Sequence, residues 1–130
     1  MPRFVVDLVV AALNEHSKPL KGARVHLFGI AYKSGVSDIR ESPAIDIARL
    51  LQRGGAAVSY SDPYVPRVKQ VDLELTAVSS GAALEQGFDC GVVTTQHAQF
   101  DYQAVAARSA CLVDRRNAFK GFPGSHIHRL

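Results

Sequence analysis

The order of hydrophobic and polar positions along the chain predicts strands that alternate with helices. Short apolar runs bounded by turn-forming residues predict strands at 24–30, 57–61, 90–95, 111–114 and 126–130, with a weaker one within 71–78. Apolar residues that recur every three or four positions predict helices at 2–13, 43–53, 79–86 and 102–108. This alternation is typical of a three-layer, Rossmann-like α/β domain, whose mainly parallel sheet is covered by helices on both faces.

The first predicted helix differs from the others. Pro2 suits its first turn, where a missing N–H costs nothing, but its apolar residues cover nearly the whole circumference. Such a helix must be buried on several sides, which in a short chain indicates a partner surface or a neighbouring domain. A polar segment with proline and glycine follows at 16–22. We therefore predict a helix with its linker at 1–20 and one domain at 21–130.

Composition excludes several classes of protein. With 130 residues, 47% of them hydrophobic and 21% charged, the chain matches one globular domain. The net charge is only +3 and no Lys/Arg run exceeds two residues, which argues against a nucleic-acid-binding surface. No apolar stretch approaches the roughly 20 residues that span a bilayer. Cys90 and Cys111 form no Cys-x-x-Cys pair, so neither a zinc site nor a disulfide scaffold is expected, and we predict a cytoplasmic location.

Polar side chains gather where the predicted strands end. These residues are Tyr32, Lys33, Asp38, Arg40, Asp62, Thr94, Thr95, Gln96, His97, Asp114, Arg115, Arg116 and Asn117. Ligands of open α/β sheets bind outside the carboxyl ends of the strands. Lys33, Arg40 and Arg116 would place three cations near the helix that Ser42 caps and Pro43 begins, and this arrangement suits a phosphate or pyrophosphate.

Each of these residues also has a purely structural interpretation. Lys33 alone is typical of a solvated loop, and Asp38, Arg40 and Glu41 of a surface ion-pair cluster. Asp62 before Pro63 is first a turn former, His97 fits a structural hydrogen-bonding role, and both cysteines fit the core. The glycines at 29 and 35 match neither the dinucleotide fingerprint nor a P-loop.

Five segments together resemble a known family. They are Phe28-Gly-Ile-Ala-Tyr-Lys33, Asp38-Ile-Arg-Glu-Ser-Pro43, Tyr60-Ser-Asp-Pro-Tyr-Val-Pro66, Thr94-Thr-Gln-His97 and Asp114-Arg-Arg-Asn117. In this order they are similar to the C-terminal, UDP-binding domain of the UDP-glucose/GDP-mannose dehydrogenase family. The bacterial UDP-N-acetyl-hexosamine 6-dehydrogenases are the most similar branch, and the resemblance identifies the first helix as the end of an interdomain helix.

The resemblance implies an NAD-dependent parent enzyme that oxidises the C6 alcohol of a UDP-sugar to a carboxylate. The family's catalytic cysteine motif and its NAD-binding fingerprint belong to other domains and do not occur in this sequence. We therefore expect a domain that binds UDP or a UDP-sugar, is inactive alone, and works with an N-terminal and a central domain in a homo-oligomer. The alternative is a non-catalytic nucleotide-binding, interaction or dimerisation module.

The resemblance also assigns roles to residues. It implies that Lys33, with Tyr32 beside it, and Arg116 bind the substrate, while Arg40 faces the NAD side of the cleft. It implies no catalytic residue and no metal ligand on this chain. Arg115 stands where most relatives have a small residue, and the resemblance leaves open whether it contacts a phosphate or is only a surface charge.

Overall fold

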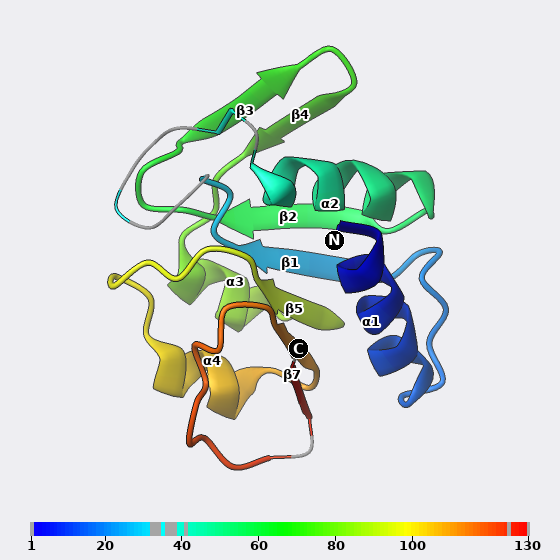
Figure 1. Ribbon diagram of the computed structural model, residues 1–130, viewed down its shortest axis with the longest axis vertical. Coiled ribbons are helices and arrows are strands. Elements are labelled where there is room, and N and C mark those ends of the chain that lie inside the picture. Colours follow the sequence, from blue (N-terminus) through cyan, green and yellow to red (C-terminus); the bar gives the residue numbers. More distant parts are fainter. Residues whose placement is uncertain (1, 32–34, 36–38, 41, 125, 130) are drawn as a thin grey trace.

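A five-stranded parallel sheet forms the centre of the molecule (Figure 1). The computed structural model describes residues 2–31, 35, 39–40, 42–124 and 126–129. In spatial order the strands are β2 (Ala57–Ser61), β1 (Arg24–Phe28), β5 (Cys90–Val93), β6 (Leu112–Asp114) and β7 (Ile127–Arg129). All four neighbouring pairs are parallel, so the predicted α/β class and the main strands are confirmed.

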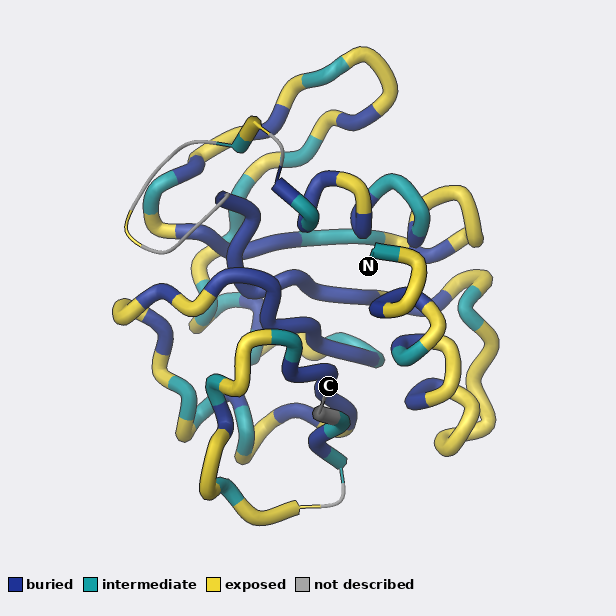
Figure 2. Tube along the Cα trace, viewed as in Figure 1, coloured by how far each residue is buried: buried dark blue, intermediate teal, exposed yellow. Residues whose placement is uncertain are grey.

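Helices cover both faces of this sheet. On one face, α1 (Pro2–Asn14) and α2 (Pro43–Arg53) pack against side chains such as Val25 and Leu27 of β1. On the other, α3 (Ser80–Gln86) and α4 (Tyr102–Arg108) pack in a second apolar cluster that contains Phe28. Neighbouring residues of one strand thus enter different clusters, as strand geometry requires. Figure 2 shows the central strands buried between these layers.

The helix α1 packs on the domain through one side of its apolar circumference. Val5, Val9 and three further residues of the helix are buried. Phe4 and Val10, however, are 50% and 42% exposed, so the surface for which the sequence predicts a partner or a neighbouring domain is open in the chain by itself. Among the residues described, no helix has the length and apolarity needed to cross a membrane.

A small antiparallel hairpin stands apart from the main sheet. It consists of β3 (Arg67–Gln70) and β4 (Leu73–Thr76), whereas the sequence predicts an irregular segment and then one weak strand within 71–78. Val68 and Leu73 anchor the hairpin in the core of the α2 face. Arg49 of α2 holds its tip through a 2.9 Å contact with Asp72.

The order of the strands creates a switch point between β1 and β5. The chain leaves β1 through α2 to reach β2, on one side of β1, and leaves β5 through α4 to reach β6, on the other. The two connections therefore diverge at the carboxyl edge of the sheet. In open α/β sheets, ligands bind in the crevice at such a point.

Candidate functional site

The loop after β1 and the loop after β5 touch at Gly29. The residue has φ of +98°, a conformation that suits glycine, and a Cβ added to it would lie 2.5 Å from Cβ of Thr95. No larger residue fits between these backbones unless one of them moves. The requirement for glycine here comes from close approach at the switch point.

Two threonines fasten the same loops together. The backbone N–H groups of Thr94 and Thr95 both donate to the carbonyl of Phe28, at 3.0 and 3.2 Å. The hydroxyl of Thr94 donates to the carbonyl of Gly29, and that of Thr95 donates to the carbonyl of Ala31 at 2.7 Å. The side chains that the sequence places among the candidate ligand contacts are therefore committed to the scaffold.

Asp62, directly after β2, anchors the beginning of the β1–α2 loop. Its Oδ2 accepts backbone N–H groups from Ile30 at 2.8 Å and Ala31 at 3.0 Å, and its Oδ1 accepts that of Tyr64 at 2.8 Å. The contact with Tyr64 confirms the turn-forming role expected of Asp62. The contacts with the loop add a second function that the Asp-Pro pair alone does not reveal.

His97 completes this buried network. Its Nε2 lies 2.9 Å from Oδ2 of Asp62, and its Nδ1 accepts the backbone N–H of Gly35 at 3.1 Å. Because Nδ1 accepts, the ring proton must sit on Nε2 and donate to the carboxylate. The prediction of a structural hydrogen-bonding role for His97 is confirmed. The pair fixes both ends of the segment 30–35.

The start of α2 lies at the same edge of the sheet. Ser42 caps the helix as predicted: its hydroxyl accepts the N–H of Ala44 at 3.3 Å and also donates to the carbonyl of Ile30 at 2.7 Å. A hollow of about 180 Å³ beside the first turns of α2, between the helix and β3, is lined by Ser42, Asp46 and Gln70 and by the exposed Arg40. One cation of the predicted set is thus at the helix start.

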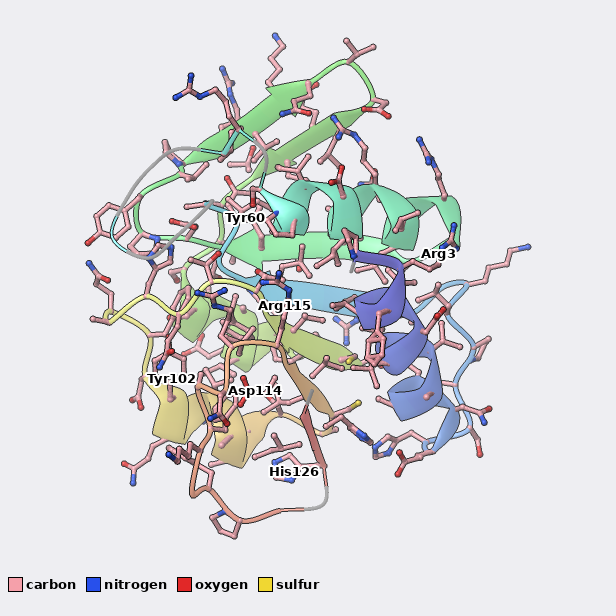
Figure 3. All side chains as sticks on the ribbon, in the orientation of Figure 1. Arg3, Tyr60, Tyr102, Asp114, Arg115 and His126 are labelled. Atoms are coloured by element: carbon pink, nitrogen blue, oxygen red, sulfur yellow. The ribbon has the colours of Figure 1, made fainter. Side chains whose placement is uncertain are left out.

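The end of β6 brings two more cations to this edge. The buried carboxylate of Asp114 accepts the backbone N–H groups of Arg116, Ala118 and Phe119 at 3.2, 2.9 and 2.9 Å. These bonds fold the segment after β6 into a fixed turn. Arg116 is exposed, whereas Arg115 is partly buried and extends toward the loop after β5 (Figure 3).

The structure describes some of the predicted site residues and not others. Tyr32, Lys33 and Asp38 lie outside the described residues. Arg40 and Arg116 are both exposed at the carboxyl edge of the sheet, one before α2 and one after β6. Their roles as cofactor and substrate contacts stay predictions.

The cysteines lie at the opposite edge from these cations. Cys90 begins β5 and Cys111 precedes β6, so both stand at the amino ends of parallel strands. Both are fully buried free thiols with their sulfur atoms 3.6 Å apart, which confirms the prediction of core residues. Within the described part of the chain, no group of three His, Cys, Asp or Glu side chains is arranged to hold a metal.

Comparison with protein families gives a direct match. The model of the UDP-glucose/GDP-mannose dehydrogenase family, UDP binding domain, matches residues 26–121. Among curated proteins, UDP-glucose 6-dehydrogenase of Rickettsia bellii is 29% identical over 92% of this chain. UDP-N-acetyl-D-mannosamine dehydrogenase of Pyrococcus horikoshii is 29% identical over 99% of it. The chain spans 29% and 30% of the length of these two relatives.

Solved structures give the same result. The UDP-D-ManNAc dehydrogenase from Pyrococcus horikoshii superposes with a TM-score of 0.80 and 25% identity, covering 98% of this chain and 30% of that one. A UDP-glucose dehydrogenase from the archaeon Pyrobaculum islandicum gives a TM-score of 0.76 and 30% identity, covering 98% and 28%. The similarity therefore includes α1 as well as the sheet.

Proposed function

The chain belongs to the UDP-glucose/GDP-mannose dehydrogenase family through its UDP-binding domain, and on this basis we propose that it holds the diphosphate of a UDP-sugar for oxidation of the sugar at C6. The product would be a UDP-uronic acid. The relatives, more than three times as long, would correspond to the complete enzyme, with NAD-binding and catalytic domains that cooperate with this one. Arg116 and Lys33 would contact the substrate, with Tyr32 beside them.

The switch point between β1 and β5 is the observation that carries this proposal. Asp62, His97 and the two threonines hold the described residues of both flanking loops, so a ligand would meet a preformed edge at these positions. Arg115 and Arg116 bring guanidinium groups to that edge. A guanidinium can bind a phosphate through two parallel hydrogen bonds and keeps its charge at all physiological pH values.

Covalent catalysis is not part of the proposed role. Cys90 and Cys111 are buried at the amino edge of the sheet, and a nucleophile would have to reach substrate at the carboxyl edge. The contact with Cys111, and then burial, also raise the pKa of the Cys90 thiol far above its ordinary value, whereas nucleophilic attack needs the thiolate. We therefore expect no turnover by this chain alone.

NAD in the usual Rossmann position does not fit the residues that are present. An acidic residue after the second strand would bind the ribose there. Here the corresponding Asp62 is saturated by the N–H groups of Ile30, Ala31 and Tyr64 and by His97. We propose that NAD binds to another domain of the complete enzyme and that Arg40 faces it across the cleft.

Calorimetric titration with UDP and with uridine tests the proposal. Wild-type protein should bind UDP more tightly than uridine, and Lys33→Ala and Arg116→Ala should each weaken UDP binding about tenfold or more, the usual value of a charge-assisted hydrogen bond. Lys120→Ala is the matched control, because Lys120 is an exposed cation four residues beyond Arg116. Equal affinity for UDP in all variants would contradict the assigned site.

A role in assembly is the second candidate, and the exposed side of α1 favours it. Phe4 and Val10 leave apolar surface open to water on the helix that packs on the domain through its other side. We propose that this surface packs against other domains or subunits of the complete enzyme. Sedimentation of the chain and of a Phe4→Glu, Val10→Glu variant tests this: self-association that the charges abolish supports it, and a monomer at all concentrations contradicts self-association.

A further inference from the structure

Arg115 has a hydrogen-bonding environment that the protein leaves incomplete. Among the residues that the structure describes, its fully covered Nε has no hydrogen-bond partner, and its Nη1 makes one long contact of 3.4 Å with the carbonyl of Thr94. Across the described ranges of the chain, no carboxylate forms an ion pair with this guanidinium. A guanidinium carries five N–H donors, so the described residues of the protein engage only a small part of its capacity.

The environment of this side chain favours an added anion. Burial, and to a smaller extent the neighbouring Arg116, lowers the pKa of Arg115 from its ordinary value, which means that both effects disfavour the charged form. An arginine nevertheless stays protonated in proteins. A partly desolvated cation with a second cation beside it is most simply stabilised by negative charge from a ligand.

The nearest carboxylate in the sequence forms no ion pair with Arg115 among the described residues. Asp114 directs both oxygens to backbone N–H groups, one to Arg116 and Ala118 and the other to Phe119. It also sets the course of the chain at this turn, so that the two arginines follow one another at the carboxyl edge. The hydrogen bonds of Asp114 therefore stabilise the turn, and the guanidinium of Arg115 remains available to bind an anion.

We propose that Arg115 is a second phosphate-binding residue, which acts with Arg116 on the diphosphate group of the nucleotide. The inference rests on the proposed function for the identity of that nucleotide. The contact with Thr94 orients the guanidinium at the switch point, where the loops after β1 and β5 diverge. A diphosphate can receive hydrogen bonds from both guanidinium groups, whereas uridine without phosphate gains nothing from either.

Titration of the full chain with inorganic pyrophosphate, UDP and uridine tests this inference. Arg115→Gln keeps a side-chain N–H for the carbonyl of Thr94 but removes the charge. It should weaken pyrophosphate and UDP binding about tenfold to hundredfold, the effect of losing a hydrogen bond to a charged group. Arg115→Lys should retain part of the affinity. Arg108→Gln, at the exposed end of α4, removes one charge elsewhere and should change affinity little.

A second measurement separates ligand contact from mere support of the fold. In wild-type protein, the NMR resonance of the Arg115 Nε–H should shift on addition of pyrophosphate, and thermal unfolding should show that Arg115→Gln is folded. An unmoved resonance, or an Arg115→Gln variant that binds pyrophosphate as Arg108→Gln does, overturns the inference.

The outcomes also distinguish this inference from the proposed function. Binding of pyrophosphate that depends on Arg115, with UDP bound no more tightly than pyrophosphate, supports the anion contact and contradicts the uridine nucleotide as ligand. Tight UDP binding that depends on Arg116 but not on Arg115 supports the uridine nucleotide as ligand and contradicts the anion contact of Arg115. A wild-type chain that binds neither UDP nor pyrophosphate overturns both.

Discussion

Asp62 and His97 form a hydrogen-bonded pair at 2.9 Å whose side chains are both completely buried. The pair joins three segments, because Asp62 follows β2, His97 follows β5, and both also hold the loop after β1. The carboxylate accepts the N–H groups of Ile30 and Ala31, and the imidazole accepts that of Gly35. The geometry of the switch point thus depends on one buried carboxylate.

Asp62→Ala should destabilise the domain strongly. It leaves several buried donors without an acceptor, each of which costs about 1–3 kcal/mol, so a loss of about 3 kcal/mol or more is expected in urea unfolding. Hydrogen exchange at the amides of Ile30 and Ala31 should accelerate. Asp72→Ala is the control, since Asp72 pairs with Arg49 at the surface and should matter much less. Equal stability of the two variants would refute this role of Asp62.

Gly29→Ala should be among the most damaging single-methyl additions to the chain. The new Cβ would meet Thr95 at 2.5 Å in a backbone conformation that already disfavours alanine, so we expect a loss of about 2 kcal/mol or more. Gly81→Ala in α3 adds the same methyl group to open space in a helix and should stabilise by about 0.5–1 kcal/mol. Thermal unfolding of both variants measures the difference, and effects of the same sign would contradict the close-approach argument.

His26 should make the stability depend on pH. It lies buried in β1 between two hydroxyls: Ser59 Oγ is 2.7 Å from Nδ1, and Ser61 Oγ is 2.7 Å from Nε2. Since Ser61 donates its own proton to the carbonyl of Val78, it must accept from Nε2–H, and Nδ1 accepts from Ser59. Burial lowers the pKa of His26 to about 4.

The direction of the pH effect follows from that pKa. An unfolded histidine has a pKa near 6.5, so between pH 6.5 and 4 the unfolded chain binds the extra proton and the folded chain does not. The free energy of unfolding should therefore fall as pH is lowered through this window, by about 2 kcal/mol between pH 7 and 5 from this residue. Urea unfolding of wild type and His26→Gln at both pH values checks this, and the variant should lose correspondingly less. Identical losses would assign the pH dependence to other groups.

The two cysteines should be inert in the folded protein. The contact between the two thiols raises the pKa of Cys90 and lowers that of Cys111, but both side chains are fully buried, so alkylation by iodoacetamide at pH 8 should require unfolding. Mass spectrometry of the native chain over several hours should find little modification, and the same reaction in urea should modify both. Rapid labelling of either thiol in native protein would contradict the burial described for the strand starts.

The sequence is most informative where a local physical signal is strong. The bounds of α2 are predicted to the last residue by Ser42, Pro43 and the glycines at 54 and 55, because the start and the end of a helix depend mainly on neighbouring residues. Parallel strands are likewise predictable as short apolar runs between turns. The class of the fold follows from these signals.

The hairpin has no such signal. Its two-residue turn is Val71–Asp72, without the asparagine or glycine that normally marks a tight turn, and Pro66 directly precedes β3. Tertiary contacts stabilise it instead, through the burial of Val68 and the contact from Arg49 to Asp72. Contacts between distant segments cannot be seen in a local pattern.

The sequence predicts which residues lie at the candidate site, but it does not predict the role of each residue there. Asp62, Thr94, Thr95 and His97 follow strands as expected, yet their side chains build the edge of the sheet and do not extend from it as free ligand contacts. Arg115 shows the opposite case. Only its burial beside an already committed carboxylate distinguishes it from an ordinary surface charge.

The large separation in sequence between α1 and β6 has a consequence for biosynthesis. The buried side of α1 packs on α2 and on β5 and β6, and the last of these strands is synthesised about 100 residues after the helix. At a translation rate of about 5–20 residues per second, several seconds or more pass between the synthesis of α1 and the synthesis of β6. During that interval the nascent chain exposes a strongly apolar helix, which is the kind of segment that chaperones bind. In a strain with little chaperone capacity, this protein should therefore aggregate during translation, even though the completed fold is stable.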